Sequence, residues 1–195
     1  MKTHSIVLAA FLSTAAMPMA YAETAAPAAA ATEEAVQPVE KAAAAMEAEA
    51  STAYANAAAI ADMYEVEAAN IAWERSTSED VKAYAKMLIA DHTATTAKLK
   101  VLVDQAEGTL PDSLDDRHEA MIKALKDADD ATFNQTFLNQ QVEAHTAALK
   151  LHKAFAKSGD REEFKTFAAE TAKAVEHHLE QAKALGGEEA TASMN

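Results

Sequence analysis

Apolar side chains recur every three or four residues through most of the chain after residue 51, which is the spacing of an amphipathic α-helix. Gly and Pro fall at the junctions between these stretches, at Gly108, Pro111, Gly159 and Gly186. No useful stretch alternates apolar and polar residues as a strand does. The pattern predicts four long helices and one shorter helix, over residues 52–75, 76–107, 114–126, 131–157 and 161–185.

The lengths of the connections indicate how these helices pair. Tight turns join the first two long helices and the last two, so each pair should form an antiparallel hairpin. A longer crossover, which contains the short helix, joins the two hairpins. The chain therefore predicts an all-α, ferritin-like four-helix bundle with a short crossover helix between the second and third long helices.

The ends of the chain differ in composition from the helical part. Residues 1–22 combine an early Lys, an apolar run and small residues at Ala20-Tyr21-Ala22, which is typical of a cleaved signal peptide and predicts export to the periplasm. Residues 23–38 contain almost no large apolar side chains and predict a disordered Ala/Pro-rich tether, which extends to residue 51 if the packed part begins late. The folded domain is then 52–185, and residues 186–195 form a disordered tail.

Composition excludes several classes of protein. The chain has 17 basic and 31 acidic residues, a formal net charge of −14, so nucleic acid is not an expected partner because its phosphates would be repelled. It has no cysteine, which excludes disulfides, thiol catalysis, covalent haem and a lipoprotein anchor. No apolar stretch is long enough for a stable membrane span, so we do not expect an integral membrane protein.

Each long helix places one polar side chain among its apolar positions. His92, His145 and His178 continue the apolar faces of the second, third and fourth long helices, and Glu67 shares a face with Ile60, Tyr64 and Ile71. At about 1.5 Å rise per residue, all four lie near the middle of their helices. We therefore expect an acid and three imidazoles to meet inside the bundle.

Such a group has two physical interpretations. Glu67, His92, His145 and His178 suit one transition-metal ion, with Zn, Cu, Fe and Ni all compatible with three nitrogens and one oxygen. The alternative is a metal-free network of the acid, the imidazoles and water, because a buried carboxylate needs a partner. Asp91 and Glu65 are the candidates for hydrogen-bonding the outer nitrogens of the ligands. His152 is a further candidate nearer the bundle end, and His177 points nearer the rim.

The same positions carry a family resemblance. The chain resembles an exported bacterial family of ferritin-like helical domains known as domain of unknown function 4142, over about residues 52–185. The matching segments are Glu65-Val66-Glu67, Val81 to Met87 running into Asp91-His92, Leu110-Pro111, Val142 to His145, and His178-Leu179 with Ala182. The resemblance implies a helical bundle, a periplasmic location and no assigned activity, and it matches the four core residues to recurrent polar positions of the family. Asn134 and Lys173 depart from the family pattern.

Three functions follow from these observations. The first is a periplasmic metal-binding bundle that acts in envelope stress or metal homeostasis. The second is a metal-free helical scaffold or a chaperone-like interaction protein. The third is a metal-dependent enzyme acting on peroxide or superoxide, which is disfavoured because no base or substrate pocket stands out. A di-iron centre is not expected, since no Glu-x-x-His motif precedes the three histidines.

Overall fold

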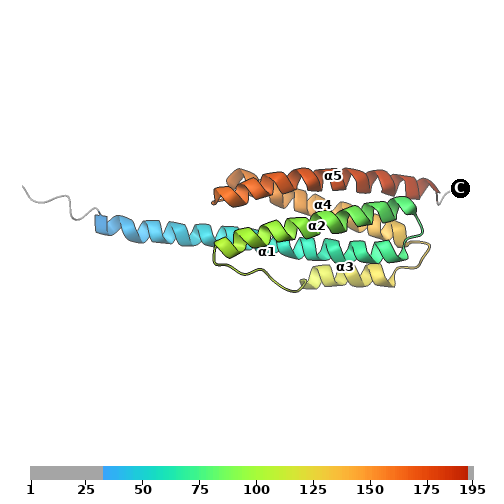
Figure 1. The fold of residues 1–195 in the computed structure, drawn as a ribbon, viewed down its shortest axis with the longest axis horizontal. Helices are drawn as coiled ribbons and strands as arrows, with labels where there is room; N and C mark the ends of the chain where they lie inside the picture. Colours follow the sequence, from blue (N-terminus) through green and yellow to red (C-terminus); the bar gives the residue numbers. More distant parts are fainter. Residues whose placement is uncertain (1–32, 193–195) are drawn as a thin grey trace, which may run out of the picture. The chain divides into compact units, whose positions relative to one another are not determined.

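The fold was derived from a computed structural model that describes the backbone of residues 33–192 and the side chains of residues 49–186. The predicted signal peptide, residues 1–22, lies outside the described part. The chain divides into two units, Met1–Pro38 and Val39–Asn195, and the bundle belongs to the second. Its helices, shown in Figure 1, are α1 (Glu33–Arg75), α2 (Glu79–Gln105), α3 (Asp116–Asp127), α4 (Phe133–Ser158) and α5 (Glu162–Ala192).

The helical class and the helix order are confirmed. Residues 33–192 contain five helices and no strand, and the short α3 lies in the crossover between α2 and α4. α5 packs against both α4 and α2, and α3 packs against α4. Within this described part, no helix is both long and apolar enough to cross a membrane. The ferritin-like assignment of the bundle stays a prediction.

Three helix boundaries differ from the predicted ones. α1 begins at Glu33, inside the predicted tether, because a segment rich in alanine is a strong helix former even without large apolar side chains. α5 continues past Gly186 to Ala192, since glycine weakens a helix without forbidding it. α2 begins at Glu79 with Ser78 as its N-cap, whose side chain accepts a hydrogen bond from the Val81 N–H. The helix predicted over residues 76–107 therefore begins later than expected.

The buried face of α1 is also different from the prediction. The sequence suggested a face through Ile60 and Ile71, yet both are only half-buried. The buried side of this helix consists mainly of alanine, with Tyr54 and Tyr64 as its large members. Small side chains let neighbouring helices approach closely, because the distance between two helix axes depends on the side chains at their contact. This rotation of the face decides which carboxylates enter the core.

Two side chains fasten α1 to the rest of the bundle. Arg75, the last residue of α1, donates hydrogen bonds to the carbonyl oxygens of Leu125, Lys126 and Ala128 at 2.7–3.0 Å, which satisfies the carboxyl end of α3. At the other end of the packed part, the Ser51 hydroxyl donates to Asp160 in the α4–α5 turn at 2.7 Å. The crossover helix and the turn are thereby held in place around the core.

The apolar core consists of two clusters that occupy opposite ends of the bundle. One contains Tyr64, Leu88 and Phe137, and the other contains Tyr54, Leu99 and Phe164. Along each long helix, the residues between the two clusters include buried polar side chains, among them Asp62, Glu65, His92, Gln141, His145 and His178. The bundle is therefore two apolar ends with a polar layer between them.

Mutation of Gly159 and of Gly186 to alanine should change the stability of the protein in opposite directions. A Cβ at Gly159 would lie 2.5 Å from the Phe155 ring and 2.7 Å from the Phe155 carbonyl oxygen, so Gly159→Ala should destabilise the protein by about 1–3 kcal/mol. A Cβ at Gly186 meets nothing closer than 3.8 Å, so Gly186→Ala should stabilise α5 by up to about 1 kcal/mol. Urea unfolding measures both changes. Equal effects of the two substitutions would contradict the packing of the α4–α5 turn.

Candidate metal centre

The polar layer brings together side chains from all four long helices. α1 contributes two acids, α2 and α5 one histidine each, and α4 a histidine and a glutamine. Their exposed fractions are 4% or less for all but His92, at 5%: Asp62, Glu65, His92, Gln141, His145 and His178. Groups this polar are rarely buried so completely unless they are paired or bind a ligand.

The three histidines form a compact triangle. The ring centres of His92 and His145 lie 5.6 Å apart, and the His178 ring centre lies 5.3 Å from each of them. One nitrogen of each ring lies within 4.8 Å of the corresponding nitrogens of the other two. The structure thus brings His92, His145 and His178 together in the core, and their role as metal ligands stays a prediction.

Each ring is held through its outer nitrogen by an oxygen acceptor. His92 Nδ1 lies 2.8 Å from Asp62 Oδ1, His145 Nδ1 lies 3.0 Å from the Gln141 carbonyl oxygen, and His178 Nε2 lies 2.9 Å from Asp91 Oδ2. A carbonyl or an ionised carboxylate only accepts, so each of these nitrogens donates its hydrogen. The opposite nitrogen of each neutral ring then carries the lone pair.

Those opposite nitrogens have no hydrogen-bond partner among the described residues. They are His92 Nε2, His145 Nε2 and His178 Nδ1, and all three are shielded from solvent. An unpaired buried acceptor costs free energy in the absence of a ligand. A ring that donates outward to oxygen and presents a lone pair inward is the arrangement in which histidine binds metals.

The electrostatics favour neutral rings at two of the three positions. Burial lowers the pKa of His145 to about 3, and the nearby cationic forms of His92 and His178 lower it further. Burial also lowers the pKa of His178, more than its hydrogen bond to Asp91 raises it. At His92, burial alone would lower the pKa, but the hydrogen bond to Asp62 and the neighbouring carboxylate of Glu65 raise it overall.

Two acids of α1 support the triangle from outside. Asp62 accepts from His92 through Oδ1 and from the Thr96 hydroxyl through Oδ2 at 3.1 Å, so both of its oxygens are used. Glu65 Oε1 lies 3.5 Å from His145 Nδ1. Burial raises the pKa of Glu65 to about 7, against the lowering effect of the His92 cation. Burial thus favours the neutral form of Glu65, and a cation bound by the histidines would favour its ionised form.

Glu67 does not belong to this group, and the prediction that it faces the three histidines is wrong. Its side chain is 43% exposed, and Oε1 pairs with Lys126 Nζ at 2.9 Å on the outside of the bundle. The physical reason is the rotated face of α1 described above. Glu65, two residues earlier, points inward instead. Asp91 and Glu65, which were expected to lie beside the outer nitrogens of the histidines, contact His178 and His145 respectively.

Asp62 and Gln141 are the members of the layer that sequence reasoning missed. Asp62 lies three residues before Glu65, so its placement follows once the alanine-rich face of α1 is taken as the buried one. Gln141 lies one turn before His145 and accepts its hydrogen bond through the backbone carbonyl oxygen. Every residue has such an oxygen, so the residue type at position 141 could not have indicated this role. The other candidates lie apart: His152 bonds Tyr54, and His177 contacts Gln181 at the exposed surface.

The triangle is close to the size that a transition metal requires. Metal–nitrogen bonds of about 2.0–2.1 Å imply nitrogens roughly 3.3–3.5 Å apart around a tetrahedral ion. The observed nitrogens, all within 4.8 Å, would have to close by no more than about 1.5 Å. Three imidazole nitrogens bind Zn(II), copper, Fe(II) and Ni(II), and they leave one coordination position to an exogenous ligand.

Comparison with known protein families identifies the family of this chain. The family described as domain of unknown function (DUF4142) matches residues 20–185, most of the chain. The chain belongs to this family. The resemblance seen in the sequence is thereby confirmed, although the family description assigns no function.

Among solved structures, this DUF4142 protein resembles CopM in the Cu(I)-bound form. The TM-score is 0.59 and the identity 16%, and the alignment covers 69% of this chain and 94% of that chain. At this identity the likeness shows a shared helical fold. The comparison with curated proteins gave no match.

His152 predicts a loss of stability in acid that is separate from the triangle. Burial lowers its pKa to about 4, and its Nδ1 is hydrogen-bonded to the Tyr54 hydroxyl at 2.9 Å. Between about pH 6.5 and 4 only the unfolded state takes up the proton, so stability is complete above pH 6.5 and falls as the pH drops. The maximum loss is on the order of 3 kcal/mol.

The matched variant is His152→Gln, whose amide oxygen can still accept from Tyr54 but does not titrate. Urea unfolding with chelator present, at several pH values from 7.5 to 4, should show a steeper loss in the wild type than in the variant. Parallel curves would mean that the pKa of His152 is not depressed in the folded state.

Proposed function

We propose that this protein binds one transition-metal ion per chain through His92, His145 and His178. The observation that carries the proposal is the set of three buried inward nitrogens without hydrogen-bond partners, on rings whose outer nitrogens all donate to oxygen. A metal-free network would need a side-chain donor at each of these nitrogens or water between them, and no side chain of the described residues supplies such a donor. The arrangement supports a metal ligand set better than it supports a hydrogen-bonded core.

The donor set favours an ion that accepts neutral nitrogen ligands. Zn(II), Cu(I), Cu(II), Fe(II) and Ni(II) all do so. Copper has one additional support, because the structural neighbour CopM is described in a Cu(I)-bound form. Asp62 and Asp91, which accept from His92 and His178, would increase the basicity of those two rings and hold them in orientation.

The proposed cellular role is metal binding in the periplasm, in metal homeostasis or envelope stress. The signal-like pattern of residues 1–22 supports export. A site whose three histidines are at most 5% exposed fits sequestration or buffering of an ion better than turnover of a substrate. The acidic chain would also attract cations from solution.

Metal titration of the protein, first stripped with chelator, tests the ligand set. Isothermal titration calorimetry should give one Zn(II) per chain, and the same experiment under anaerobic conditions should give one Cu(I). His145→Gln and His178→Gln should each weaken Zn(II) binding by more than about 100-fold, since even an outer-shell partner is worth about 10–100-fold. Zn(II) should also raise the thermal unfolding midpoint of the wild type. At a Zn(II) concentration of a hundred times Kd, the free energy of unfolding should increase by about 2.7 kcal/mol.

Glu67→Gln is the matched control, because Glu67 lies on the same helix as Asp62 and Glu65 but pairs with Lys126 outside the core. Its Zn(II) affinity should stay within about twofold of the wild type, while both histidine variants keep their helical circular dichroism. Absence of saturable binding by the wild type, or unchanged affinity in both histidine variants, would refute the proposal and favour a metal-free scaffold.

A further inference from the structure

An ion that reaches the triangle must pass between helices, because all three histidines are at most 5% exposed. The outer partners of the rings show where the barrier is thinnest. Asp62, behind His92, has a side chain only 6% exposed, and the Gln141 carbonyl behind His145 belongs to a fully buried residue. Asp91, behind His178, has a side chain that is 50% exposed. Of the three acceptors behind the rings, only the one at His178 is half exposed to solvent.

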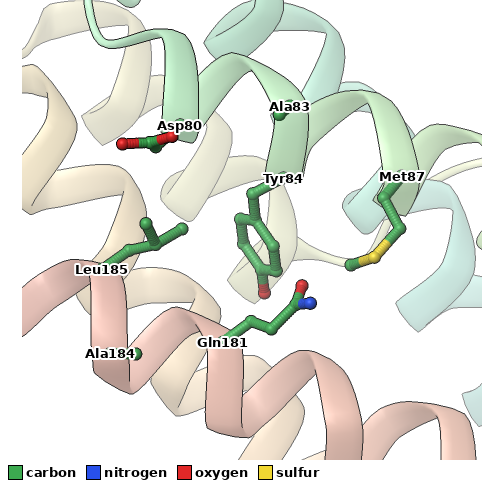
Figure 2. Close-up of a pocket in the computed structure, with 7 residues that line it drawn as sticks. All are labelled: Asp80, Ala83, Tyr84, Met87, Gln181, Ala184 and Leu185. Carbon is green, nitrogen blue, oxygen red and sulfur yellow. The ribbon is translucent and has the colours of Figure 1, made fainter.

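A surface pocket lies on this same side of the bundle. It occupies about 550 Å³ between α2 and α5, and it is lined by Asp80, Ala83, Tyr84, Met87, Gln181, Ala184 and Leu185. Figure 2 shows Tyr84, Met87 and Gln181 pointing from the two helices into the space between them. The side chains of α2 and α5 therefore leave a recess in the seam next to the layer.

The recess and the triangle are connected through named contacts. The Tyr84 hydroxyl donates to the backbone carbonyl of His178 at 3.1 Å. On α2, the spacings of Tyr84, Met87 and Asp91 are three and four residues, which places Asp91 on the same face as the recess and one turn beyond Met87. Asp91 then contacts His178 Nε2 at 2.9 Å. The seam thus leads from solvent to the outer side of one ligand.

We infer that the α2–α5 seam is the route by which the metal enters, with Asp91 capturing the hydrated cation beside His178. This inference rests on the proposed function and adds the path to the site. Asp91 is a positioning residue, since it acts on the ion before the ion is bound and through His178 afterwards.

A groove between α1 and α2 is the competing route, because Asp62 lines it. There, however, both oxygens of Asp62 already accept hydrogen bonds, from His92 and Thr96, and its side chain is only 6% exposed, so it is less available to an arriving ion than Asp91 is. Its charge is also nearly enclosed, which reduces its attraction for a cation in solution. The two routes therefore predict different effects of the two carboxylates on the rate of uptake.

Stopped-flow measurement of Zn(II) transfer from a fluorescent indicator to chelator-stripped full-length protein tests the route. Asp91→Asn keeps an oxygen acceptor for His178 but removes the charge, so its association rate constant should fall about 5–10-fold at roughly 0.1 M salt. The difference from wild type should largely disappear at about 1 M salt, where the screening length is about 3 Å. A purely structural role of Asp91 would not produce this salt dependence.

Asp104→Asn is the control, since it removes the same charge from an exposed position of α2 outside the recess, about 20 Å away and beyond the screening length of about 10 Å at 0.1 M salt. Its association rate should match the wild type, and Asp62→Asn should change mainly the dissociation rate. Equal association rates in Asp91→Asn and Asp104→Asn, or a larger salt-dependent decrease in Asp62→Asn, would overturn the route while leaving the metal site intact. Failure of the wild type to take up Zn(II) would overturn both.

Discussion

The hydrogen bonds from the outer nitrogens of three histidines to oxygen acceptors are the interactions on which the polar layer depends. They come from three different helices and end on Asp62, the Gln141 carbonyl and Asp91. Because each acceptor fixes which nitrogen carries the hydrogen, it also fixes the direction in which the lone pair points. The convergence of three lone pairs is thus a result of their neighbours as much as of the histidines themselves.

This arrangement makes the middle of the bundle costly in the absence of a ligand. Two apolar clusters lie on either side, and the layer between them carries unpaired nitrogens, an unpaired Glu65 oxygen and the unpaired amide of Gln141. An apolar layer of the same volume would cost less. Retaining polar groups at such a place is understandable if they bind something, and three imidazoles with supporting carboxylates suit a cation.

The carboxylates that support the histidines are buried to different degrees on the two sides of the polar layer. On the side of α1 the supporting carboxylate is enclosed and doubly hydrogen-bonded, which suits permanent orientation of His92. On the side of α2 and α5 the supporting carboxylate is half exposed beside a surface recess, which suits exchange with solvent. The carboxylate that holds His92 is therefore enclosed, whereas the carboxylate that holds His178 is accessible to solvent.

The sequence by itself determined the helices, their order and the three histidines, because apolar spacing and helix breakers are local properties that each segment carries alone. For α2, α4 and α5 the face defined by large apolar residues is the buried face, so His92, His145 and His178 could be found. For α1 the large apolar residues predict the wrong buried face, since this helix contacts the bundle mainly through alanines. The sequence analysis therefore placed Glu67 in the core, whereas Asp62 and Glu65 are the acids that lie there. Only the tertiary structure decided that rotation, the backbone acceptor at Gln141 and the exposure of Asp91, because each depends on how closely neighbouring helices approach.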